Sequence, residues 1–143
     1  MSAELDSLET PYEQSQAKET VEFGDGEEVT KEFVTTSFSL VTPPRIKASF
    51  SREGLTSRVV KLFKKEVQVG DPTFDDVVYI STDTPAETAA FLKSDDVRAT
   101  ILQAVTDGGN IVIDERDIVT KIPSQDGGDD KPLANLVRAV LKA

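Results

Sequence analysis

The apolar residues of this 143-residue chain change their spacing along its length, and this change constrains the fold more than any other feature. Between residues 20 and 50 they alternate with polar residues, which is the period of a half-buried β-strand. From residue 54 onward, segments in which they recur three and four positions apart, as in an amphipathic helix, alternate with further strand-like segments. This pattern predicts one α+β domain, an antiparallel sheet with three to four helices packed on one face.

The strand patterns fall into four groups. A β-hairpin is predicted over residues 20–33, because the Gly24-Asp25-Gly26 cluster between its two halves tolerates positive φ. A second pair of strands is predicted within residues 38–50, on either side of two prolines that cannot donate to a sheet. The stretch VVYIST (77–82) has strong β propensity and predicts a central strand. The stretch NIVIDERDIVTKIP (110–123) predicts another hairpin around an acidic turn.

Four segments show helical spacing. The first, residues 54–66, places basic residues opposite its apolar face, with Thr56 or Ser57 as the N-cap. The second starts at Asp83 or Thr84, followed by Pro85. The third starts at Ser94 or Asp95 and ends at Gly108. The fourth, near the C-terminus, is capped by Asp130 and carries one apolar stripe, which comprises Leu133, Leu136, Val137, Val140 and Leu141.

The net charge of −10 is divided unevenly along the chain. Residues 1–32 carry a balance of −8, residues 45–65 a balance of +6, and the remainder −8. The cations of the predicted helix form a basic band that predicts an anion or partner site, at Arg58, Lys61, Lys64 and Lys65. An acidic protein segment suits this band better than nucleic acid, because the body is acidic and aromatic residues are sparse. A solvated helix face is the alternative interpretation.

The composition excludes several chemistries. Without His there is no imidazole base and no histidine metal site, and without Cys there is no thiolate nucleophile or zinc cluster. Catalysis would have to rest on carboxylates, Lys, Arg, Tyr or hydroxyl groups. The composition therefore favours a protein that is not an enzyme, and it indicates no cofactor.

The stretch VGDPTFDD (69–76) is the most concentrated acidic motif. Its three carboxylates, Asp71, Asp75 and Asp76, are the only candidates for a divalent metal site, although they lack the spacing of an EF-hand. The alternative is mechanical: Pro72 holds Asp71 extended, Phe74 anchors the loop, and Asp75 or Asp76 accepts backbone N–H groups before the strand. We favour this structural turn, in which Gly70, Asp71, Phe74 and Asp75 form the motif and no metal is bound.

Three other acidic or glycine-rich stretches are predicted to be ordinary loops. SQDGGDD (124–130) and EFGDGEE (22–28) have the composition of turns and caps. DGGN (107–110) ends a helix and starts a strand, and it is no phosphate cradle because the helix precedes the glycines.

The segment Val69–Ile122 resembles a group of bacterial domains of unknown function. In that group a Gly-Asp-x-x-Phe-Asp motif opens a strand, a short helix carries a Leu, and a second helix leads into a hairpin. The resemblance rests on Gly70, Asp71, Phe74 and Asp75 and on the spacing to Leu92. It implies an α+β fold and a structural role for the motif, and it brings no reaction, cofactor or catalytic residue.

These patterns divide the chain into a disordered acidic arm, residues 1–18, and one domain, residues 19–143. No membrane span and no secretory signal are indicated, which predicts a cytoplasmic location. The function expected is that of a non-enzymatic protein-interaction or scaffold domain with an unknown protein partner, and a homodimer is compatible with it. The alternatives are a small acidic chaperone of the bacterial secretion type and a magnesium-assisted enzyme acting on a phosphate-bearing substrate.

Overall fold

The computed structural model describes residues 10–22, 26, 28–52, 65–66, 69–106, 108–114, 116–123 and 131–142. Within them the strands, in chain order, are β1 (Tyr12–Glu22), β2 (Glu28–Ser39), β3 (Ala48–Arg52), β4 (Lys65–Glu66), β5 (Val78–Thr82), β6 (Asn110–Asp114) and β7 (Asp117–Pro123). The helices are α2 (Pro72–Val77), α3 (Pro85–Phe91), α4 (Asp95–Thr106) and α5 (Lys131–Lys142).

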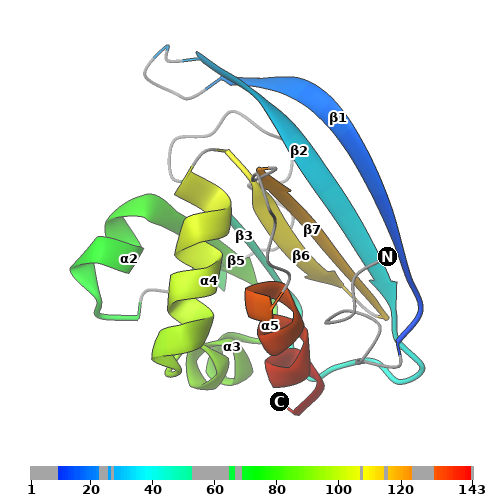
Figure 1. Cartoon of the computed structure of the whole chain (residues 1–143). Helices are drawn as coiled ribbons and strands as arrows, with labels where there is room; N and C mark the ends of the chain where they lie inside the picture. Colours follow the sequence, from blue (N-terminus) through cyan, green and yellow to red (C-terminus); the bar gives the residue numbers. More distant parts are fainter. Residues whose placement is uncertain are drawn as a thin grey trace.

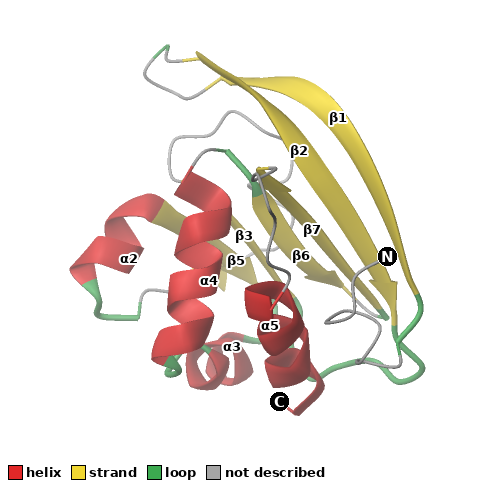
Figure 2. Cartoon of the chain, in the orientation of Figure 1, coloured by secondary structure: helices red, strands yellow, loops and turns green. Residues whose placement is uncertain are grey.

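The described strands form one sheet in the order β1-β2-β7-β6-β3-β5-β4, and every neighbouring pair is antiparallel. The helices gather on one face of this sheet (Figures 1 and 2). The predicted α+β architecture is therefore confirmed. The strand VVYIST is less central than expected, because only the two-residue β4 lies beyond β5.

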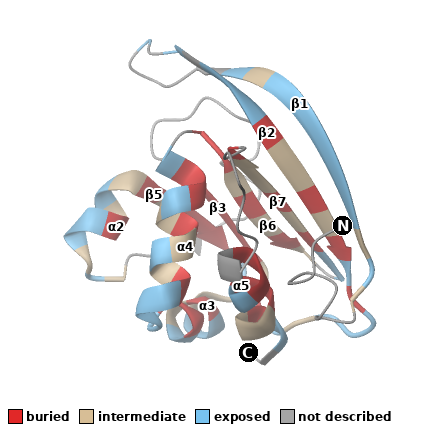
Figure 3. Ribbon diagram, in the orientation of Figure 1, coloured by how far each residue is buried: buried red, intermediate tan, exposed pale blue. Residues whose placement is uncertain are grey.

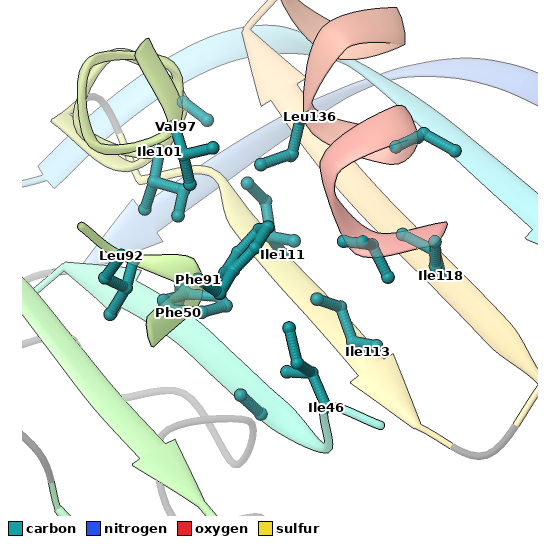
Figure 4. Packing of buried hydrophobic residues seen from close by; sticks show 14 of the residues in the cluster. Ile46, Phe50, Phe91, Leu92, Val97, Ile101, Ile111, Ile113, Ile118 and Leu136 are labelled. Carbon is teal, nitrogen blue, oxygen red and sulfur yellow. The ribbon is translucent and has the colours of Figure 1, made fainter. Parts of the chain in front are cut away.

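The core lies between the sheet and its helices (Figure 4). Phe50, Ile111 and Ile113 come from neighbouring strands and are fully buried, and Ile101 of α4 and Leu136 of α5 pack in the same cluster. Burying one such side chain stabilises the fold by about 1.5–3 kcal/mol. The alternation of apolar residues in the strands and their three-and-four spacing in the helices supply the two sides of this core.

The predicted helix boundaries largely agree with the structure. Thr84 is the N-cap of α3, with Pro85 directly after it, and the Ser94 hydroxyl accepts the backbone N–H of Val97 at the start of α4. Gly108, after α4, has φ +96°, a conformation that glycine adopts at little cost. The stripe on α5 is buried except at Leu141, which is 46% exposed.

Two predictions about strands were wrong. The first strand of the hairpin begins at Tyr12, so residues 12–18 belong to β1 and not to a disordered arm. This segment has few apolar residues because an edge strand is held by backbone hydrogen bonds to β2, which already supplies the apolar side chains. The second pair of strands is not a pair: β3 contacts β6 and β5, while β2 continues to Ser39 and contacts β7.

The sheet face away from the helices contains two buried serines. Ser49 and Ser51 alternate with the core residues of β3, and neither side chain is accessible to solvent. Their hydroxyls have no hydrogen-bond partner within the part of the chain that the structure describes. A buried hydroxyl that lost its water without gaining a partner destabilises the fold.

We therefore expect Ser49→Ala and Ser51→Ala each to change the free energy of unfolding by between about 0 and +2 kcal/mol, a neutral to stabilising effect. Thr82→Val is the matched control, since its buried hydroxyl donates to the Lys47 carbonyl at 2.6 Å and accepts the Thr84 N–H at 2.9 Å. That change should destabilise by about 1–3 kcal/mol. Urea denaturation followed by circular dichroism measures all three, and destabilisation by both serine variants would contradict the assignment.

Candidate functional site

The acidic motif at residues 69–76 forms the start of a short helix and not a turn that opens directly into a strand. Asp71 is the N-cap of α2 in extended geometry (φ −100°, ψ 105°), and Pro72 follows it. The helix forms because an N-cap followed by proline is a strong start signal, the same signal that was recognised at Thr84-Pro85. The expectation of a structural turn was wrong in this respect.

The carboxylate of Asp75 accepts hydrogen bonds from the backbone. Its two oxygens accept the backbone N–H groups of Val69 and Gly70, each at 2.9 Å. Asp71 accepts the N–H of Phe74 at 3.4 Å and forms an ion pair with Nε of Arg98 on α4, also at 3.4 Å. Phe74 is 1% exposed, so its side chain anchors α2 to the core, while the carboxylates of Asp71 and Asp75 hold the N-terminus of the helix.

The third carboxylate of the motif does not join the other two. Asp76 is exposed, and its side chain forms no hydrogen bond or ion pair with the rest of the described chain. Among the described residues, no group of three or more Asp or Glu side chains lies close enough together to hold a metal ion. Asp71 and Asp75 therefore act as a clamp, by which we mean that their side chains hold the N-terminus of α2. The arrangement of the three aspartates gives no support to a magnesium site.

The three aspartates should differ in their effect on stability. Asp75→Ala leaves two N–H groups without an acceptor and should cost about 2–3 kcal/mol, whereas Asp71→Ala removes one long cap bond and should cost about 1 kcal/mol. Asp76→Ala should change the free energy of unfolding by less than about 0.5 kcal/mol. Chemical denaturation gives this ranking. Equal effects that appear only in the presence of Mg²⁺ would instead indicate a shared metal site.

The basic band is not brought together by the described structure. Arg58, Lys61 and Lys64, and the helix predicted for them, lie outside the described residues. Lys65, expected on that helix, belongs instead to β4, where it is paired with Thr82 of β5. Strand pairing replaced helix propensity at this position, since β5 offered an edge for backbone hydrogen bonds.

The most unusual surface of the molecule is the hairpin of β1 and β2. The ladder between these strands runs from Tyr12↔Phe38 to Glu22↔Glu28, but β7 contacts β2 only from Phe33 onward. The outer half of the hairpin therefore extends beyond the body of the sheet, as Figure 1 shows. Most of β1 is exposed (Figure 3), and no other described strand pairs with it. We call the side of β1 that faces away from β2 the open edge.

The register shows which backbone groups of β1 point to the open edge. The N–H of Ser39 donates to the carbonyl of Pro11 at 2.9 Å, which makes Pro11 and Ser39 a hydrogen-bonded pair. Because hydrogen-bonded and non-hydrogen-bonded pairs alternate in an antiparallel ladder, the odd-numbered residues of β1 bond to β2. Even-numbered residues such as Gln14, Lys18 and Thr20 therefore direct their N–H and C=O groups outward.

A pocket of about 420 Å³ lies next to the start of β1. It is formed by the two residues before β1, by the connection between β2 and β3, and by the last turn of α5. In Figure 1 these three parts lie together at one end of the sheet. Val41 and Leu141 are the exposed large hydrophobic residues of the described chain, and both line this pocket. We call it the apolar pocket.

Sequence reasoning missed both the open edge and the apolar pocket. The only signal for β1 was its polar composition with Val21 at one end, which is typical of an edge strand and also of a disordered segment. The pocket has no local signal, because its walls come from residues 10–11, 39–45 and 141.

None of the described helices is long and apolar enough to span a membrane. No family model matches this chain, and no match was found among the curated proteins or the solved structures. The resemblance to the Gly-Asp-x-x-Phe-Asp domains therefore stays a prediction, and the function has to be inferred from the surface of the molecule itself.

Proposed function

We propose that this chain is a non-enzymatic protein-interaction domain that binds an extended segment of its partner along the open edge of β1. The single observation that carries the proposal is this edge: eleven residues pair with β2 on one side and with no described strand on the other. Addition of a strand to a sheet edge is a common mode of peptide recognition, in which backbone hydrogen bonds provide the affinity.

The shape of the hairpin supports this mode of binding. Natural proteins usually shorten or cover their edge strands, since an open edge pairs with other chains. Here the edge strand is long, and its outer half extends beyond the sheet, where β2 is the only described strand that pairs with it. A partner strand placed there would meet outward-directed groups at alternate residues, including Gln14, Lys18 and Thr20.

The charge of β1 favours a different protein over a second copy of this chain. The strand carries Glu13, Glu19 and Glu22 against Lys18, and Glu19 already forms an ion pair with Lys121 of β7 at 2.6 Å, which leaves a balance of −1 toward an added strand. Pairing β1 with β1 would bring acidic residues together, which destabilises a sheet, whereas a basic segment would be attracted. The proposal places this partner in the cytoplasm, as the sequence suggests, and it includes neither nucleic acid nor membrane as the ligand.

A proline at Lys18 tests the proposal, because it removes an outward N–H and blocks the open edge without breaking the ladder to β2. Wild type, Lys18→Pro and Lys18→Ala serve as baits in extracts of the native cell, and Lys18→Ala controls for the lost charge. We expect wild type and Lys18→Ala to retain the same proteins and Lys18→Pro to lose them. Equal retention by all three baits, or no retention by wild type, would contradict edge binding.

A further inference from the structure

The apolar pocket lies where a strand added to β1 would end, and we infer that it determines which segment binds. This inference rests on the proposed function. The ligand is an extended basic segment with one large apolar side chain near its C-terminal end, followed by a carboxylate. The apolar side chain enters the pocket while the residues before it pair with β1.

The walls of the pocket match a large apolar side chain. Half of its ten lining residues are large apolar residues or prolines of the β2–β3 connection and α5, namely Leu40, Val41, Pro43, Pro44 and Leu141. Val41 is 88% exposed and Leu141 46% exposed, although both would be more stable out of water. Exposed apolar residues gathered around a concave site are typical of a binding surface, and the volume accommodates a leucine, methionine or phenylalanine side chain.

The pocket adjoins the N-terminal end of β1. Thr10 and Pro11 line it and directly precede β1, and the bond from Ser39 N–H to the Pro11 carbonyl holds this segment to the end of β2. All neighbouring strands of the described sheet are antiparallel, so we place the added strand antiparallel to β1. Its chain then runs from the outer half of the hairpin toward Tyr12, and its C-terminal residues arrive at the pocket.

Charge specifies the rest of the ligand. Because Glu19 is paired with Lys121, Glu13 and Glu22 against Lys18 leave β1 a balance of −1, which attracts lysine and arginine. Glu13 is the second residue of β1, close to the pocket. Among the described residues that line the pocket, Arg45 is the only charged one, and it is exposed. A guanidinium at this point pairs with a carboxylate, either the C-terminus of the segment or an acidic side chain after the apolar residue.

Selection from a library of random peptides with free C-termini, displayed on ribosomes and captured by the immobilised full-length chain, tests this inference. We expect enrichment of Lys and Arg, with Leu, Met or Phe within the last few residues. For one enriched peptide made synthetically, Val41→Ser with Leu141→Ser should raise the Kd at least tenfold. The matched control, Ala99→Ser with Gln103→Ser on the exposed side of α4, should leave it within twofold. Arg45→Gln should remove the preference for the free acid over the carboxamide.

The outcomes separate this inference from the proposed function. If Lys18→Pro abolishes binding and the pocket variant does not, the edge binds a segment but the pocket does not select it, and the inference is wrong. If the pocket variant abolishes binding and Lys18→Pro does not, edge pairing itself is wrong. Self-association of the wild type that the pocket variant reverses would identify a second copy as the occupant. Absence of any enriched peptide would contradict both.

Discussion

Gly109→Ala is expected to destabilise the protein by about 3–5 kcal/mol. A Cβ at this position would overlap with the backbone carbonyl oxygens of Ala104 in α4 and Lys121 in β7. Neither oxygen belongs to a flexible side chain, so the helix or the strand would have to move. Since domains of this size are stable by only about 5–15 kcal/mol, much of the folded population would be lost.

The control for this prediction is Gly70→Ala. Gly70 has φ +85°, but a Cβ there would meet nothing within 4 Å. Its cost is therefore the strain of the left-handed conformation alone, about 1–2 kcal/mol. Urea denaturation followed by far-ultraviolet circular dichroism suits both variants, because the chain contains no Trp. Equal stability losses in the two variants would show that close approach at Gly109 is not what excludes a side chain.

Ala17→Pro and Lys18→Pro are expected to give opposite results although the residues are neighbours. Ala17 is paired with Phe33 in a hydrogen-bonded position, so proline there removes a bond to β2 and places its ring against that strand. We expect a loss of roughly 2–3 kcal/mol, including the cost of the unpaired Phe33 carbonyl. Lys18 directs its N–H to the open edge, and Lys18→Pro should cost less than about 1 kcal/mol.

The measurement is again chemical denaturation, together with amide spectra that report whether the hairpin is intact. Lys18→Ala separates the effect of the proline ring in Lys18→Pro from the loss of the Lys18↔Glu32 cross-strand pair. If Lys18→Pro unfolds the hairpin and Ala17→Pro does not, the even-numbered residues of β1 bond to β2, and the assignment derived from the Ser39–Pro11 bond is wrong. Confirmation of the expected order would also show that Lys18→Pro is a folded protein, which its use in the binding experiments requires.

The clamp on α2 and the open edge were predictable to different degrees. The sequence motif placed Asp71, Phe74 and Asp75 at a structural junction, since Asx chemistry and proline act over three or four residues. It did not show that the two carboxylates are held by backbone N–H groups and by Arg98, which is 27 positions from Asp71 in the chain and close to it only in the fold. The edge was missed because nothing in a polar segment tells whether a neighbouring strand is present.

The sequence by itself determined the α+β class, the starts of α3 and α4, and the hairpin of β6 and β7. The predicted cap of α5, Asp130, lies outside the described residues. Capping, turn formation and hydrophobic period depend on residues within one or two turns of each other, so a single chain segment contains the information. Only the tertiary structure decided the order of the strands, in which β7 and β6 separate β2 from β3. It also decided why Gly109 cannot carry a side chain, and why residues 10–11, 39–45 and 141 form one pocket. These features depend on which distant backbones approach each other, and that is set by the packing of the whole core.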